Sequence, residues 1–148
     1  MKQAIIFIGI PGSGKTYFYY RHFAETHERI APEEMEPEET QELLQEYLEE
    51  GIDFVIDAAN LTRAGREVYL KAAEAAGYQI EGYFFASDTE EAIHWNAQRE
   101  ESERKTAQAI QADSGILEPP SLAEGFDTLY YVRRMDEAEM SAVEWQGV

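Results

Sequence analysis

The chain has 148 residues, the size of one ordinary domain, and its 44% hydrophobic and 28% charged residues are typical of a globular protein rather than a disordered one. Thirty acidic residues against twelve basic ones give a formal net charge of −18, which argues against a general nucleic-acid or anionic-membrane coat protein, because phosphate groups repel such a surface. Cysteine is absent, which excludes disulfides, thiol catalysis and cysteine-based zinc sites.

The N-terminal region predicts neither a membrane segment nor a leader. Its apolar run breaks at Gly9 and Pro11 and is too short to span a bilayer. It also lacks the small-residue cleavage site of a signal peptide. We therefore expect a cytoplasmic protein without a membrane partner.

Apolar runs separated by glycines and capping residues predict strands that alternate with helices. The predicted strands are 3–8, 29–31, 53–57, 79–85 and 128–132. The predicted helices are 15–24, 37–50, 63–76 and 88–99. An exposed helical segment is expected at 100–112 and an amphipathic tail from residue 136. Alternation of this kind implies right-handed crossovers. We expect one α/β domain over residues 1–148, with about five parallel strands and helices on both faces of the sheet.

The charge is concentrated in one stretch of the chain. Residues 1–24 carry three bases and no acid, whereas residues 25–50 carry eleven glutamates and a single arginine. Pro37 suits a first helical turn and Gly51 suits a helix end, with an apolar stripe between them. The acidic stretch is therefore best interpreted as the solvent-facing side of a helix.

The loop after the first predicted strand carries a phosphate-binding motif. Gly9-Ile10-Pro11-Gly12-Ser13-Gly14-Lys15-Thr16 matches G-x-x-x-x-G-K-[ST], with a hydrophobic strand before it and a helix after it. Backbone N–H groups of such a loop converge on phosphate oxygens, helped by the helix N-terminus. Lys15 is expected to contact the β- and γ-phosphates and Thr16 to ligate Mg²⁺. We predict a P-loop NTPase fold that binds ATP, since the chain has no Asn-Lys-x-Asp string for guanine.

Asp57 ends the strand that begins at Phe54. A carboxylate at the carboxyl end of a neighbouring parallel strand lies beside the phosphate loop. It can hold Mg²⁺ there, usually through water. The alternative is a turn or capping aspartate. We expect Asp57 and Thr16 to be the metal-site residues.

Four further segments carry a resemblance to a known family. They are Asp57-Ala58-Ala59-Asn60-Leu61-Thr62-Arg63, His94-Trp95-Asn96-Ala97-Gln98-Arg99, Leu117-Glu118-Pro119-Pro120-Ser121 and Glu124-Gly125-Phe126-Asp127. In this order they resemble the AAA-like family of small P-loop kinases similar to phage polynucleotide kinase. The resemblance covers residues 5–132.

The resemblance implies transfer of the ATP γ-phosphoryl group to a hydroxyl. It adds Asn60 and Arg63 to the nucleotide-binding residues of the loop. It also implies a lid at about 99–115, in which Arg99, Arg104 or Lys105 supplies a cation for the transferring phosphoryl group, and an acid after the second strand that acts as general base.

The base position differs from the family pattern. Where the family tends to have aspartates followed by an arginine, this chain has Glu33, Glu34 and, at the arginine position, Glu36. Glu33 or Glu34 is the candidate base. Two like charges about 8 Å apart repel by about 2 kcal/mol at an effective dielectric constant near 20. The acidity therefore disfavours long nucleic acid and favours a small hydroxyl compound or a short nucleic-acid end as acceptor.

Two other functions remain open from the sequence. One is a nucleotide-binding switch or ATPase that works with a protein partner and transfers no phosphoryl group. The other is a toxin-like kinase that acts on a small molecule such as a sugar nucleotide.

Overall fold

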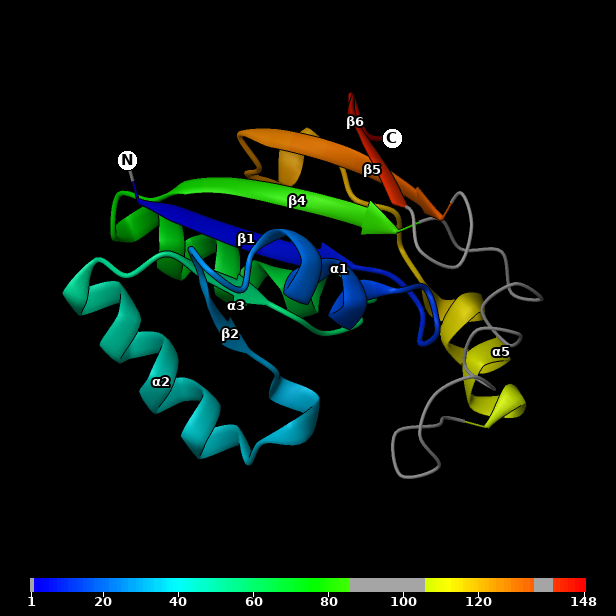
Figure 1. Cartoon of the computed structure of the whole chain (residues 1–148), viewed down its shortest axis with the longest axis horizontal. Coiled ribbons are helices and arrows are strands. Elements are labelled where there is room, and N and C mark those ends of the chain that lie inside the picture. Colours follow the sequence, from blue (N-terminus) through cyan, green and yellow to red (C-terminus); the bar gives the residue numbers. More distant parts are fainter. Residues whose placement is uncertain (1, 86–105, 135–139) are drawn as a thin grey trace.

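The computed structural model of the chain describes residues 2–85, 106–134 and 140–148 (Figure 1). The predicted helix 88–99 and three of the predicted site residues, Arg99, Arg104 and Lys105, lie outside these ranges.

One six-stranded sheet organises the described part of the chain, in the order β2-β3-β1-β4-β5-β6 (Figure 1). The first five strands run parallel, and β6 pairs with β5 in the antiparallel direction. The predicted parallel sheet is confirmed, but the sixth strand, formed by the tail, was not expected. The strands are β1 Gln3–Ile8, β2 Glu28–Ile30, β3 Phe54–Ile56, β4 Gln79–Phe85, β5 Thr128–Arg134 and β6 Met140–Trp145.

Helices cover both faces of this sheet, as predicted. Leu44 of α2 and Leu70 of α3 pack on one face, and Phe18 of α1 packs on the other. The Thr62 hydroxyl caps α3 by accepting a hydrogen bond from the Gly65 amide. The α-helices are α1 Lys15–His22, α2 Pro37–Glu50, α3 Arg63–Ala75 and α5 Ala107–Ile116, with short 3₁₀ turns η1 Pro32–Glu34 and η3 Leu122–Glu124.

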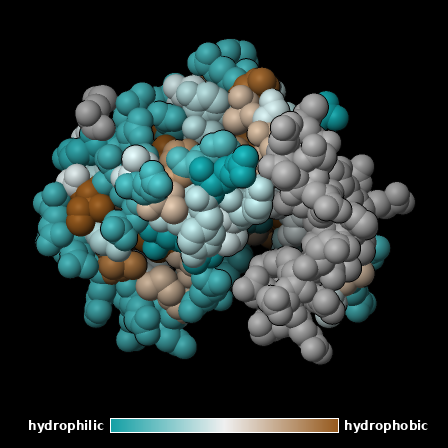
Figure 2. All heavy atoms as spheres, in the orientation of Figure 1, coloured by the Kyte–Doolittle hydropathy of each residue, from teal (hydrophilic) through white to brown (hydrophobic). Residues whose placement is uncertain are grey.

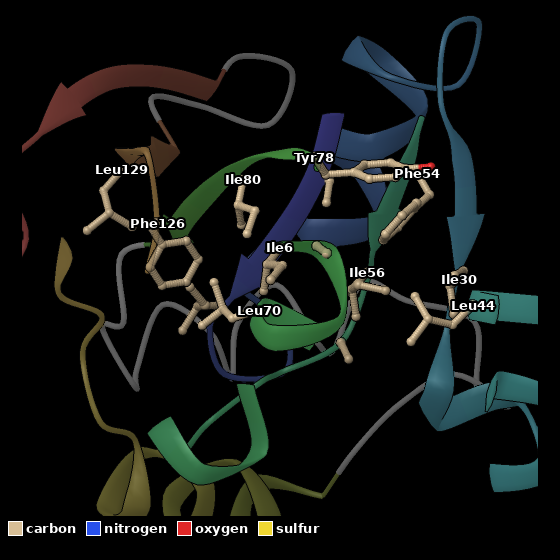
Figure 3. Packing of buried hydrophobic residues seen from close by; sticks show 14 of the residues in the cluster. Ile6, Ile30, Leu44, Phe54, Ile56, Leu70, Tyr78, Ile80, Phe126 and Leu129 are labelled. Carbon is tan, nitrogen blue, oxygen red and sulfur yellow. The ribbon is translucent and has the colours of Figure 1, made fainter. Parts of the chain in front are cut away.

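The larger core cluster lies between the sheet and the α2–α3 layer (Figure 3). Phe54 and Tyr78 lie together at one end of it, with ring centroids 5.5 Å apart, and Phe126 and Leu129 lie at the other end. Ile6 and Ile56 fill the middle (Figure 3). This core fixes the strands whose carboxyl ends carry the candidate site.

The segment 100–112 was expected to be helical and exposed. Within its described part, α5 is helical and mostly exposed, but Ile110 is fully buried. Its partner is Ile10 of the phosphate loop, also fully buried. A third cluster, Ile10 and Ile110 with Leu61 and Leu117 against them, therefore links the loop to α5.

The described surface is mainly polar. The face in Figure 2 is mostly hydrophilic, with apolar residues scattered in small patches. Among the described residues, no helix has both the length and the apolar character needed to cross a membrane.

Candidate functional site

The phosphate loop connects β1 to α1 and is held against the end of β3. The Gly9 amide donates to the Ala59 carbonyl at 3.0 Å. A Cβ at Gly9 would lie 2.9 Å from Ser13 Oγ and 3.0 Å from Phe85 Cβ, so only glycine fits where the loop passes β4. Gly12 and Gly14 have φ angles of 85° and 96°, which favour glycine.

The Lys15 side chain folds back onto the backbone of this loop. Its Nζ donates to the carbonyl oxygens of Gly9 and Ile10 at 2.8 and 2.9 Å and to Ser13 Oγ at 3.4 Å. The residue is only 9% exposed. A nearly buried ammonium inside a glycine-rich loop at a helix N-terminus provides positive charge where phosphate oxygens would bind.

Thr16 and Asp57, the two predicted metal-site residues, lie side by side, and their role as metal ligands stays a prediction. Thr16 Oγ1 donates to Asp57 Oδ2 at 2.9 Å, and the Asp57 side chain is 2% exposed. Because the hydroxyl gives its only proton to Asp57, its oxygen lone pairs can accept a cation. Hydroxyl and carboxylate oxygens are the hard ligands that Mg²⁺ prefers, so this pair fits the ion chemically.

The described residues offer no larger metal site. No group of three His, Asp or Glu side chains in the described ranges is arranged to hold an ion. Mg²⁺ in nucleotide sites usually has one or two protein ligands, with the rest from phosphate and water. Two protein oxygens are therefore enough for a nucleotide-dependent Mg²⁺ site.

Arg29 also contacts Asp57, which the sequence analysis missed. Its Nε donates to Asp57 Oδ2 at 2.8 Å, and its Nη1 donates to Glu34 Oε2 at 3.0 Å. Burial acts to lower the pKa of Arg29, but the hydrogen bonds and charges of Asp57 and Glu34 outweigh it and raise the pKa. The pairing of β2 with β3 explains this contact: Arg29 lies opposite Val55, and Asp57 lies two residues beyond Val55 on the same face of the sheet.

The structure separates the two candidate bases. The Ala59 amide donates to Glu33 Oε2 at 3.3 Å, which places this carboxylate beside the segment that holds the phosphate loop. Burial, and then the charge of Glu33, raise the pKa of Tyr69. Glu34, by contrast, has a 61% exposed side chain and pairs with Arg29. Glu36 is exposed at the N-terminus of α2.

Asn60 and Arg63 were expected to contact nucleotide. Asn60 has a φ of 48°, and its Nδ2 donates to the Phe7 carbonyl at 2.6 Å, so its amide ties the β3–α3 loop to β1. The Arg63 side chain is exposed at the start of α3, and its backbone amide donates to Glu118 Oε1 at 3.1 Å. The nucleotide-binding roles of both stay predictions.

The comparisons with known proteins give a family and a fold. The AAA domain family matches residues 5–116. A search of curated protein sequences finds no significant match. The family match bears out the expected AAA-like family. The likeness to polynucleotide kinases in particular stays a prediction.

Three solved structures illustrate the shared fold. A gluconokinase from Sinorhizobium meliloti 1021 is 17% identical, with a TM-score of 0.63 over 92% of this chain and 85% of that chain. Kti12 from Chaetomium thermophilum, solved with ADP-AlF3, is 17% identical, with a TM-score of 0.65 over 91% and 92%. A chain of the PezAT toxin-antitoxin system from Streptococcus pneumoniae is 13% identical, with a TM-score of 0.66 over 96% and 72%.

Proposed function

The chain belongs to the AAA domain family, and from this membership we propose that it is an ATP- and Mg²⁺-dependent phosphotransferase in which residues 1–148 form a single kinase-like domain. One observation carries the proposal: Thr16 and Asp57 meet at 2.9 Å beside a phosphate loop whose Lys15 is turned inward. This arrangement is what P-loop phosphoryl transfer needs.

The proposed roles follow from the positions. Lys15 and the loop amides hold the phosphates of ATP, and Thr16 and Asp57 hold Mg²⁺. That ion, when bound, offsets the charge of the phosphates. Most of the catalysis would come from positioning and electrostatics, because the reaction needs little covalent chemistry from the protein.

Glu33 is the proposed general base. It would take the proton of the acceptor hydroxyl as the acceptor oxygen bonds to the γ-phosphorus. The bond between that phosphorus and the bridging oxygen breaks, and ADP leaves with the electron pair. The position of Glu33 beside the Ala59 amide supports this choice over Glu34, which is engaged by Arg29. Arg99, Arg104 or Lys105 is the proposed lid cation.

A small hydroxyl compound or a short nucleic-acid end is the proposed acceptor. Glu33, Glu34 and Glu36 are all exposed on the approach beside β2, and they would repel a long polyanion. The fold shared with a gluconokinase and with a structure described as a sugar kinase, at 17% and 18% identity, is compatible with a small acceptor.

A nucleotide-dependent switch that acts on a protein partner is the second candidate. The guanidinium groups of Arg29 and Arg66 are both held by carboxylates, as in a site whose cations serve structure rather than transfer. Kti12, solved with ADP-AlF3, and the PezAT system share the fold.

Two measurements test these proposals. Saturating Mg·ATP at about 100 times its Kd should stabilise the fold by about 2.7 kcal/mol. Lys15→Ala should abolish the response, and Lys71→Ala, at an exposed lysine of α3, should keep it. No response from the unmodified protein would contradict nucleotide binding.

The second measurement tests phosphoryl transfer. ATP with a labelled γ-phosphate is offered together with 5′-hydroxyl oligonucleotides, nucleosides, sugars and small alcohols. Binding of ATP without transfer of the label to any of these compounds favours the switch.

A further inference from the structure

We propose that Arg29 is a positioning residue that competes with Mg²⁺ for the carboxylate of Asp57, and so sets how much Mg²⁺ the nucleotide site requires. This inference rests on the proposed function, because it concerns the same site. It gives a role to a side chain of β2, outside the phosphate loop.

The geometry places Arg29 on the carboxylate oxygen that also contacts Thr16. Asp57 Oδ2 accepts one hydrogen bond from Thr16 Oγ1 at 2.9 Å and another from Arg29 Nε at 2.8 Å. The Asp57 amide donates to the Ile30 carbonyl at 2.8 Å, which holds the end of β3 against β2. The carboxylate is thus fixed between the helix that begins at the phosphate loop and the strand that carries Arg29.

Burial makes this ion pair matter. The Asp57 side chain is 2% exposed and the Arg29 side chain 20% exposed, so water screens their charges less than it would on an open surface. Burying a charged carboxylate is costly unless it is paired. Arg29 pairs with the Asp57 carboxylate in the absence of nucleotide, whereas Mg²⁺ would arrive with the nucleotide. The dication must therefore approach a carboxylate that already has a fixed positive charge beside it, and the two cations repel.

Arg29 has further partners that hold it in place while it shares the carboxylate. Its Nη1 donates to Glu34 Oε2 at 3.0 Å. Its guanidinium carbon lies 5.8 Å from the centre of the Tyr20 ring, within the range of a cation–π contact. The guanidinium can therefore weaken its bond to Asp57 without losing all of its contacts. Glu34, which the sequence offered as a candidate base, acts here as an anchor for Arg29.

The decisive variant is Arg29→Gln. The amide nitrogen of glutamine stands at the same position along the side chain as Nε of arginine, so it can keep a hydrogen bond to Asp57 while the charge is lost. Arg29→Lys is the matched control, because it keeps the positive charge and loses the planar fork. Circular dichroism and thermal melting establish that each variant is folded.

The experiment measures ADP binding by calorimetry over a series of Mg²⁺ concentrations and in EDTA. We expect the Mg²⁺ midpoint of Arg29→Gln to fall at least about fivefold, because one repelling charge near the ion is gone. Arg29→Lys should stay within about twofold of the unmodified protein, because its charge is kept. An unchanged or higher midpoint in Arg29→Gln would overturn the proposal. A purely structural role for Arg29 would weaken binding in EDTA and in Mg²⁺ alike.

A measurement on the unmodified protein decides the matter if Arg29→Gln does not fold. The NMR signal of the Arg29 Nε–H group should shift when Mg²⁺ is added to the ADP-saturated protein and should not shift when Mg²⁺ is added alone. A signal that ignores Mg²⁺ in the ADP complex would overturn the inference while leaving nucleotide binding intact. Failure to bind ADP under any condition would overturn both the inference and the proposed function.

Discussion

Arg66 and Glu124 form a two-pronged ion pair inside the protein. Arg66 Nε lies 2.9 Å from Glu124 Oε1, and Nη2 lies 3.0 Å from Oε2. The Arg66 side chain is 0% exposed and that of Glu124 is 9% exposed. Arg66 also donates to the Asn60 carbonyl at 2.7 Å, and Glu124 accepts from the Ser121 amide. The pair therefore joins α3, the β3–α3 loop and η3.

Removing one partner of this pair should be costly. Glu124→Ala leaves a buried guanidinium without its carboxylate, and we expect the free energy of unfolding to fall by about 3–5 kcal/mol in urea denaturation. The exposed pair of Lys71 and Glu67 on α3 provides the control, and Glu67→Ala should lower the free energy of unfolding far less. Equal decreases in the free energy of unfolding in the two variants would show that burial does not make the Arg66–Glu124 pair more important for stability.

The sequence predicts well where the cause of a structure is local. The strand 3–8, the phosphate loop and the Thr62 cap each depend on residues a few positions apart, and all three appear as expected. Asp57 was placed beside Thr16 by a rule about parallel strands. Hydrophobic period, turn chemistry and motif spacing are sufficient for such features.

The sequence does not reveal pairings between distant charges. Arg29 and Asp57 are 28 positions apart and Arg66 and Glu124 are 58 apart, and a lone arginine carries no mark of its partner. The Glu124-Gly125-Phe126-Asp127 segment stands out in the sequence only through its resemblance to the kinase family. The strand β6 was missed because its exposed pattern is set by pairing with β5 and not by a buried face.

The contact of Ile10 with Ile110 predicts that α5 supports the phosphate loop. Both side chains are fully buried in the same small cluster. Ile110→Val should lower the free energy of unfolding by about 1 kcal/mol, and it should weaken ADP binding because it loosens the packing behind the loop. Ile116→Val, at a 57% exposed position of the same helix, should change neither quantity by a measurable amount. A stability loss without any change in ADP affinity would argue against the coupling.

Gly82 marks a close approach between β4 and the segment that follows η3. A Cβ there would lie 2.7 Å from both Leu129 Cδ2 and Phe126 Cε1. Gly82→Ala should therefore overpack the core and reduce the free energy of unfolding by about 1–3 kcal/mol. Gly115, in α5, has no atom within 4 Å of an added Cβ, so Gly115→Ala should stabilise the helix by about 0.5–1 kcal/mol. Denaturant titration of the two variants should give changes of opposite sign.

Glu33 and Glu34 should differ in their effect on phosphoryl transfer. If Glu33 takes the acceptor proton, Glu33→Gln should lower kcat by about 10²–10⁴-fold, because the base is lost while the side-chain volume is kept. Glu34→Gln removes only the anchor of Arg29 and should change kcat far less. Single-turnover transfer to whichever acceptor the labelled-phosphate survey identifies gives the comparison. Similar decreases in kcat in the two variants would argue against Glu33 as the general base.

Glu81 should make stability depend on pH. Burial, and then the charge of Asp127, raise the pKa of Glu81 above its ordinary value of 4.5. Since the folded state holds this proton more tightly than the unfolded state, stability decreases as the pH rises from the unfolded pKa through the folded pKa. Above the folded pKa the loss is complete, and below the unfolded pKa it is absent.

Glu81→Gln removes this titration and can still accept the hydrogen bond that Gln3 Nε2 donates at 3.3 Å. We expect the variant to be more stable than the unmodified protein at pH 7, and the difference to shrink as the pH falls toward 4.5. Urea denaturation at several pH values measures the difference. Only ionisation of Glu81 distinguishes the two proteins in this pH range. A difference in the free energy of unfolding that stays constant with pH would therefore mean that burial does not destabilise the ionised carboxylate.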